Sequence, residues 1–232
     1  MYVTESLFVG SVPGFLTATD LAEIGQALDG VFQRVRVGAF AATSRQESVH
    51  SIEGLSVREA MDVYEPRGRD ELMELPDAAV AVLQRAAARS LPTVQVMLPS
   101  AREMAYWTFV SYAEGQFITP HIDLSDNDPD PEHPKVAGLS ICLSDPTEYS
   151  GGEFFVETAC DPQQWLPAVD AGMATVRPEC DGSSDWYREQ PRSRWTARPG
   201  RGDALVYGSQ VTHGTEPVTC GRVSKIIGFL AC

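Results

Sequence analysis

The stretch Pro120-His121-Ile122-Asp123 contains two side chains that can bind one metal ion. Successive side chains of an extended backbone alternate between faces, so His121 and Asp123 are predicted to point the same way while Ile122 points away. A third ligand from another strand, for which the distant His213 is the candidate, would complete two nitrogens and one oxygen on one face of the ion. This ligand set leaves coordination positions open and is typical of non-haem Fe(II) sites.

The sequence around these three residues has a specific order. In chain order it contains Tyr112 and Gly115, His121-Ile-Asp123, Gly151-Gly-Glu153, Gly202-Asp203, His213, and the basic residues Arg222 and Lys225. This order, spread over residues 105–230, resembles the catalytic domain of the prolyl 4-hydroxylase-like iron(II)/2-oxoglutarate-dependent dioxygenases.

The expected fold is mainly β with flanking α-helices. Short β-rich runs separated by Gly, Pro, Asp and Asn turns predict a sandwich or barrel in the C-terminal half. The resemblance implies a double-stranded β-helix, or jelly roll, with the metal at its open mouth. We expect one domain over residues 1–232, in which residues 1–104 support a catalytic core at 105–232 that carries a long insertion at 157–200.

The resemblance also implies the chemistry. Fe(II) would be held by His121, Asp123 and His213, and 2-oxoglutarate would chelate it through a carboxylate and the keto oxygen. O2 would be the second co-substrate, and stimulation by ascorbate is compatible with the family. The reaction would convert 2-oxoglutarate to succinate and CO2 while a substrate C–H bond is hydroxylated.

The cation that anchors the distal carboxylate of 2-oxoglutarate is ambiguous in the sequence. Arg222 forms an Arg-x-Ser pair with Ser224, and arginine binds carboxylates through two parallel hydrogen bonds. Lys225 is the alternative, since it shares a strand face with Val223, the usual anchor position of the family. Arg222 and Lys225 are three residues apart, so both cannot face inward on a regular strand. By analogy, Tyr112 would donate its hydroxyl to the same carboxylate.

The first forty residues predict a helix followed by a strand. A capping cluster at residues 17–20 precedes a helix over residues 21–28. The apolar stripe of this helix consists of Leu21, Ile24 and Leu28. Residues 32–40 alternate between apolar and polar types and predict a strand.

Residues 41–68 are polar and predict a loop that contains His50 as a surface histidine. A second helix is predicted over residues 75–91, with Pro76 in its first turn. Its expected buried face consists of Ala78, Val82, Leu83 and Ala86. These elements suit a sheet that is backed by helices on one side.

The segments beside the core strands differ in their predicted roles. Residues 124–135 predict an acidic loop, in which His133 is a loop histidine rather than a metal ligand. The insertion at 157–200 is long enough to be functional or mobile. Its arginines either receive an anionic substrate or pair with acids of the same chain; they are Arg177, Arg188, Arg192, Arg194 and Arg198.

Composition excludes some classes of partner. The formal net charge of −14 argues against binding nucleic acid through its phosphates and against an anionic membrane surface. No signal peptide or membrane-spanning run is evident, and the five cysteines have no metal-site spacing. We therefore expect a cytoplasmic protein with reduced thiols, although Cys160 and Cys180 could pair on oxidation. No oligomeric state is predicted.

The expected function is hydroxylation of a small molecule, such as an amino acid or a biosynthetic intermediate. One alternative is a prolyl or other residue hydroxylase that acts on a peptide or protein. Another is a jelly-roll protein that binds a metal or ligand without turnover. A zinc-dependent hydrolase or isomerase is disfavoured, because no evident general base accompanies the three candidate ligands.

Overall fold

The computed structural model describes residues 4–36, 55–123, 135–159, 174–177 and 192–232. Its helices are η1 (Glu5–Leu7), α1 (Ala18–Ala27), α2 (Asp29–Arg36), α3 (Val57–Tyr64) and α4 (Asp77–Met97). The strands of the first half are β1 (Val9–Val12), β2 (Asp70–Leu72), β3 (Glu103–Ala113), β4 (Ile118–His121), β5 (Lys135–Cys142) and β6 (Tyr149–Gly151). The remaining strands are β7 (Phe154–Ala159), β8 (Ala174–Arg177), β9 (Arg192–Ala197), β10 (Ala204–Gly208), β11 (His213–Thr215) and β12 (Val218–Ala231). No helix in these ranges is long and apolar enough to cross a membrane.

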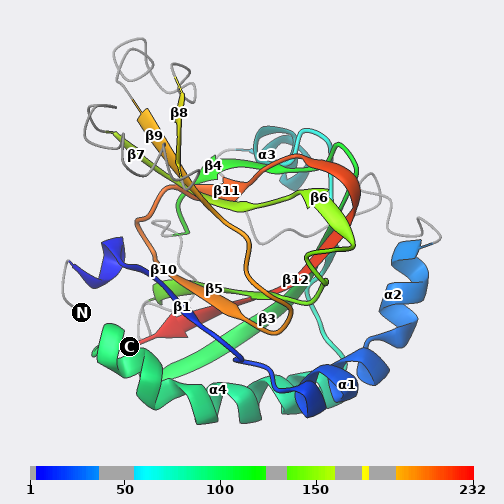
Figure 1. Ribbon diagram of the computed structural model, residues 1–232, viewed down its shortest axis with the longest axis vertical. Helices are drawn as coiled ribbons and strands as arrows, with labels where there is room; N and C mark the ends of the chain where they lie inside the picture. The colour runs from blue at the N-terminus through cyan, green and yellow to red at the C-terminus, as the bar shows by residue number, and fades with distance from the viewer. Residues whose placement is uncertain (1–3, 37–54, 124–134, 160–173, 178–191) are drawn as a thin grey trace.

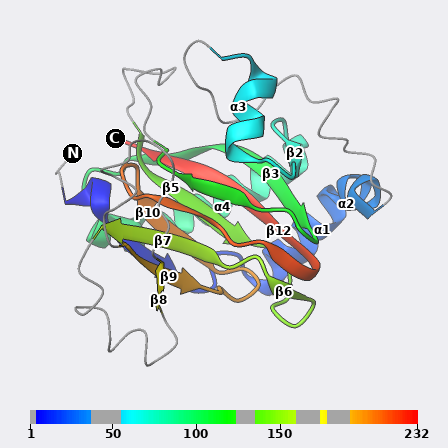
Figure 2. The ribbon, with the colours of Figure 1, turned by 90° about the horizontal axis from the view of Figure 1, so that it is seen from above.

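Two antiparallel sheets form the β-part of the molecule. The larger has seven strands, in the order β1-β10-β5-β12-β3-β2 with β6 paired to β12, and the smaller has five, in the order β4-β11-β7-β9-β8. In Figure 1 the larger sheet lies in the middle, with the smaller sheet on one side and α1 and α4 on the other. The second view shows β7 and β9 crossing one side of the structure, with α3 on the opposite side (Figure 2). The predicted jelly-roll class with supporting helices is confirmed.

The main hydrophobic core lies between the larger sheet and the helices. Leu83, Ala86 and Val94 of α4 pack there with Ile226 and Leu230 of β12. Because side chains alternate along β12, its other face bears Val223, Lys225 and Ile227 and points between the two sheets. The strand that contains both anchor candidates therefore has one face toward the helices and one toward the smaller sheet.

The first predicted helix is present, but the strand predicted at 32–40 is wrong over the part that the structure describes. Helix α1 begins after Thr17, whose hydroxyl accepts a hydrogen bond from the Asp20 N–H in a capping box. Residues 32–36 belong to α2, and residues 37–40 lie outside the described ranges. Val31 and Val35 are buried one helical turn apart, and packing of this stripe outweighs the short alternation in the sequence.

The second predicted helix is longer than expected. Helix α4 continues beyond residue 91 to Met97 and contains Pro92. Its buried stripe includes Ala79 rather than the exposed Ala78, and it extends to Val94. Burial of this last turn offsets the hydrogen bond that the proline ring removes.

Two regions predicted as loops contain regular structure. Within 41–68 the chain forms α3, which begins at a capping box between Ser56 and Glu59, and β2 follows directly. Within 157–200 the strands β8 and β9 extend the smaller sheet. Of the acidic loop predicted at 124–135, residues 124–134 lie outside the described residues, as do His50 and His133, and Lys135 begins β5.

Candidate metal centre

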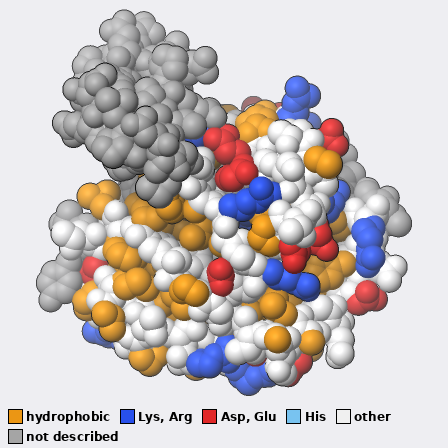
Figure 3. All heavy atoms as spheres, in the orientation of Figure 1, with side chains coloured by type: hydrophobic (Ala, Val, Ile, Leu, Met, Phe, Trp, Pro, Cys, Tyr) orange, Lys and Arg blue, Asp and Glu red, His pale blue; other side chains and the backbone are white. Residues whose placement is uncertain are grey.

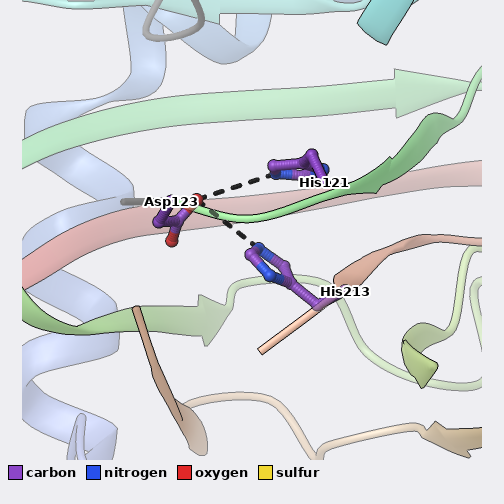
Figure 4. A group of neighbouring side chains, drawn as sticks. All are labelled: His121, Asp123 and His213. Atoms are coloured by element: carbon purple, nitrogen blue, oxygen red, sulfur yellow. Dashed lines mark ion pairs between the residues drawn. The ribbon is translucent and has the colours of Figure 1, made fainter. Parts of the chain in front are cut away.

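His121, Asp123 and His213 converge on one point between the sheets. His213 of β11 is the direct partner of His121 on β4, so both imidazoles project from the same face of the smaller sheet. Asp123 Oδ1 lies 3.7 Å from His121 Nε2 and 3.6 Å from His213 Nε2 (Figure 4). The three candidate ligand atoms all lie within 4.8 Å of one another. The convergence predicted from the sequence is therefore present.

Both imidazoles are oriented by backbone carbonyls. Nδ1 of His121 lies 2.8 Å from the Thr119 carbonyl oxygen, and Nδ1 of His213 lies 2.9 Å from that of Val211. A proton on each Nδ1 satisfies these contacts. The lone pair of each Nε2, on the side of Asp123, is then available to a metal ion. Burial lowers the pKa of His121 to about 3, with His213 adding to the effect, and burial lowers the pKa of His213 to about 4. Both rings are therefore neutral at pH 7, the form that binds metals.

Burial of the charged Asp123 carboxylate is unfavourable in free energy unless a cation lies beside it. Burial raises the pKa of its carboxyl above the ordinary value, and among the described residues nothing hydrogen-bonds to its Oδ2 atom. A buried carboxylate in this state requires a positive charge or a proton. Two neutral imidazoles beside one buried carboxylate suit a divalent transition metal better than a hard cation such as Ca2+.

Gly138 on β5 makes room for this carboxylate. A Cβ atom there would lie 2.6 Å from Asp123 Oδ2 and 2.4 Å from the Tyr207 ring, closer than real Cβ contacts allow. The Tyr207 ring in turn packs against His213, with centroids 4.2 Å apart. The absence of a side chain at Gly138 therefore leaves room for the Asp123 carboxylate and for the Tyr207 ring that packs against His213.

We expect Gly138→Ala to weaken Fe(II) affinity at least tenfold and to lower the free energy of unfolding by about 1–3 kcal/mol, because the added methyl displaces Asp123 or Tyr207. Metal titration and thermal denaturation measure the two effects. Gly25→Ala in α1, where a Cβ meets nothing within 4 Å, is the matched control and should be neutral or stabilising. Wild-type metal affinity in Gly138→Ala would contradict the steric argument.

A narrow cavity of about 40 Å3 extends from the triad toward β12. Its polar wall includes Tyr112, Thr215 and Lys225. Lys225 is buried, and its Nζ donates to Thr215 Oγ1 at 3.1 Å and lies 3.5 Å from the Gly152 carbonyl oxygen. Within the described ranges no carboxylate forms an ion pair with Lys225. Burial lowers the pKa of this ammonium to about 8.

Arg222 and Ser224 are not brought together with the triad. They lie on the face of β12 that bears Ile226, which packs against the helices. Arg222 Nη1 donates to Asp70 Oδ2 at 2.5 Å and to Ser111 Oγ at 3.2 Å, and Ser224 Oγ lies 2.9 Å from Ser111 Oγ. This geometry does not favour the Arg222–Ser224 alternative, because neither side chain lines the cavity. Lys225 shares the cavity face with Val223, as the other alternative required.

Sequence reasoning missed Arg69, which also lines this cavity. Arg69 is buried, and its Nη1 donates to the Tyr112 hydroxyl at 2.8 Å. Glu65 and Glu71 pair with it at 3.2 and 3.1 Å. Burial opposes the charged form, but Glu71, Tyr112 and Glu65 hold the pKa of Arg69 above its ordinary value. Burial also raises the pKa of Tyr112, while Arg69 opposes this shift.

Two arginines of the insertion, Arg194 and Arg198, bind acids and carbonyls of the same chain. Arg194 is buried on β9 and pairs with Glu157 and with Glu216, the latter at 2.8 Å. Arg198 donates to the Tyr149 carbonyl oxygen. Arg188 lies outside the described residues. For Arg194 the structure therefore favours the pairing alternative over reception of an anionic substrate.

A larger cavity of about 1000 Å3 lies between β1 and β10 on one side and β7 and β9 on the other. Hydrophobic side chains gather on this face below the grey atoms (Figure 3). Leu205 and Val156 line this cavity, whereas Tyr207 and Phe154, two residues away on the same strands, line the triad cavity. No histidine or cysteine occurs among its described lining residues, so the candidate chemistry belongs to the smaller cavity.

Comparisons with solved structures identify similar folds. A prolyl 4-hydroxylase from Pseudomonas putida aligns with a TM-score of 0.52 and 16% identity over 97% of this chain and 93% of that chain. A Trichoplax adhaerens prolyl hydroxylase in complex with a hypoxia-inducible factor peptide aligns with a TM-score of 0.54 and 14% identity, covering 96% and 83%. AviO1 from Streptomyces viridochromogenes Tue57 aligns with a TM-score of 0.53 and 15% identity, covering 98% and 91%. No protein-family model and no curated protein sequence matches this chain.

These similarities extend over nearly the whole chain. At such low identity they establish a shared fold, whereas function depends on the side chains that the fold brings together. The resemblance inferred from the sequence motifs is thus confirmed at the level of the fold.

Proposed function

We propose that this protein is an Fe(II)- and 2-oxoglutarate-dependent dioxygenase that hydroxylates a C–H bond of a small molecule. The observation that carries the proposal is the buried His121–Asp123–His213 triad beside a buried lysine that has no carboxylate partner in the described chain. Two neutral imidazoles and one carboxylate would hold Fe(II), and their convergence from one side leaves positions open for other molecules. When bound, Fe(II) would activate O2, so that 2-oxoglutarate loses CO2 and takes up one oxygen atom to become succinate, while the other oxygen atom enters the substrate C–H bond.

The chain's own residues bind and orient the co-substrate. Lys225 offers a positive charge to the distal carboxylate of 2-oxoglutarate, and Thr215 and Tyr112 offer hydroxyl groups on the same cavity wall. Because Thr215 Oγ1 accepts a hydrogen bond from Lys225, its own proton is available to a carboxylate oxygen. The cavity is narrow, so entry of a dicarboxylate requires the lining side chains to move apart.

The proposed substrate class is a small molecule, such as an amino acid or a biosynthetic intermediate. A peptidyl substrate is the alternative, since the Trichoplax structure of similar fold contains a bound peptide. Succinate release measured with free amino acids and with proline-containing peptides separates the two. Stimulation by the peptides alone would overturn the small-molecule proposal.

The experiment that tests the dioxygenase proposal is anaerobic titration of the Fe(II)-loaded protein with 2-oxoglutarate. Chelation of Fe(II) by the 2-oxo acid produces a visible charge-transfer band, which does not require a known substrate. Appearance of the band supports the proposal. Iron binding without the band would favour a jelly-roll protein that binds metal without oxygenase turnover, and activity sustained by zinc would indicate a hydrolase or isomerase.

We also expect 2-oxoglutarate binding to depend on pH through Lys225. Its ammonium is present below its pKa of about 8 and is lost as the pH rises above it. If only the charged form holds the carboxylate, the Kd for 2-oxoglutarate should be about tenfold higher at pH 9 than at pH 7. The same titration at both pH values measures this ratio. An unchanged Kd would show that Lys225 is not the anchor.

A further inference from the structure

Arg69 joins the α3–β2 segment to the cavity wall. Its guanidinium is held from one side by Glu65, the C-cap of α3, and by Glu71 of β2. From the other side it donates to the Tyr112 hydroxyl at 2.8 Å. Two carboxylates therefore fix the planar fork of Arg69 so that one N–H points at the phenol oxygen.

This hydrogen bond determines what the Tyr112 hydroxyl can do. A phenol has one proton and two lone pairs, and the bond from Arg69 occupies one lone pair. The Tyr112 proton must then point away from Arg69, and no acceptor for it exists in the part of the chain that the structure describes. A hydroxyl that accepts from a cation is also polarised and becomes a stronger donor. Tyr112 is thus prepared to donate to an anion in the cavity.

The same segment also touches the metal centre by separate contacts. Thr119 Oγ1 donates to the carbonyl oxygens of Val63 and Tyr64, each at 3.3 Å, and the Thr119 carbonyl oxygen contacts His121 Nδ1. The Tyr64 ring packs edge-on against His121, with centroids 5.7 Å apart. General loosening of α3 would therefore disturb metal binding, whereas loss of the Arg69–Tyr112 bond alone would not.

We propose that Arg69 is a positioning residue for the co-substrate: it orients the Tyr112 hydroxyl as a donor to the distal carboxylate of 2-oxoglutarate, which Lys225 binds from the neighbouring strand β12. This inference rests on the proposed function. The α3–β2 segment, which lies outside the sequence motifs, would thereby contribute to the affinity for the co-substrate.

A double-mutant cycle between Arg69→Lys and Tyr112→Phe tests the inference. Lysine keeps the charge between Glu65 and Glu71 but cannot also place a donor on Tyr112. We expect each single variant to raise the Kd for 2-oxoglutarate about tenfold in the anaerobic titration. Because both remove the same hydrogen bond to the carboxylate, the double variant should also be about tenfold weaker rather than a hundredfold weaker. Fe(II) affinity should stay within about twofold of the wild type.

Controls separate this role from a structural one. Arg58→Met removes an exposed arginine of α3 and should leave 2-oxoglutarate binding unchanged. If Arg69→Lys does not fold, Glu71→Gln loosens the same guanidinium, and its effect should likewise vanish in the Tyr112→Phe background. Independent, multiplicative effects, a parallel loss of Fe(II) affinity, or no effect of either variant would overturn the inference. Absence of the charge-transfer band in the wild type would instead overturn the proposed function.

Discussion

Asp123→Asn is expected to abolish Fe(II) binding and turnover while leaving the metal-free protein at least as stable as the wild type. The substitution keeps the size of the side chain but removes the charge that the cation requires. We expect loss of turnover by at least about a hundredfold, because the triad would keep two neutral nitrogens and no anionic ligand. In the metal-free protein, burial raises the pKa of Asp123, so the charged carboxylate opposes folding and the amide relieves that cost.

Thermal denaturation with and without Fe(II) measures this contrast under anaerobic conditions. At an iron concentration about a hundred times the Kd, binding stabilises the wild type by about 2.7 kcal/mol, which corresponds to a rise in Tm of roughly 5–10 °C. Asp123→Asn should lose this rise. Asp62→Asn, which replaces an exposed acid of α3, should retain it. A metal-induced shift in Asp123→Asn equal to that of the wild type would place the metal elsewhere.

The metal ligands were predictable because strand geometry converts spacing into direction. A His-x-Asp step on an extended chain points both side chains to one face. Strand β4 ends at His121, and Asp123 follows two residues later with its carboxylate on the same side as the imidazole. The third ligand came from motif order, and its position opposite His121 depends on pairing between β4 and β11 that spacing alone does not reveal. Long-range strand pairing was therefore available through the resemblance and not through local sequence.

The N-terminal errors have a different origin. Residues 32–36 alternate over too few positions to separate a strand from a helix, and burial of Val31 and Val35 against the core decides for the helix. For α3 a local signal existed, since Ser56 and Glu59 have the spacing of a capping box. Arg69 had no such signal, because an arginine in a polar stretch is ordinarily exposed and only the tertiary structure buries it.

The register of β12 predicts opposite effects of Lys225→Met and Arg222→Met on the affinity for 2-oxoglutarate. Lys225 faces the cavity, and its methionine variant keeps the length of the side chain while removing the ammonium. We expect the Kd for 2-oxoglutarate to rise at least about thirtyfold, since the distal carboxylate would be buried without a cation. Fe(II) affinity should be retained, because the substitution leaves all three candidate ligands in place. Anaerobic titration followed by the charge-transfer band measures both quantities.

Arg222→Met is the matched control, since it removes a positive charge three residues away on the helix-facing side. It should leave the Kd for 2-oxoglutarate within about threefold of the wild type. It should lower the free energy of unfolding by about 1–3 kcal/mol, because Asp70 is buried and loses its charged donor. The reverse pattern would be deficient co-substrate binding in Arg222→Met and normal binding in Lys225→Met. It would mean that the opposite face of β12 points into the cavity in the active enzyme. A one-residue change of register exchanges the two faces of a strand, so these paired variants test the geometry on which the co-substrate site depends.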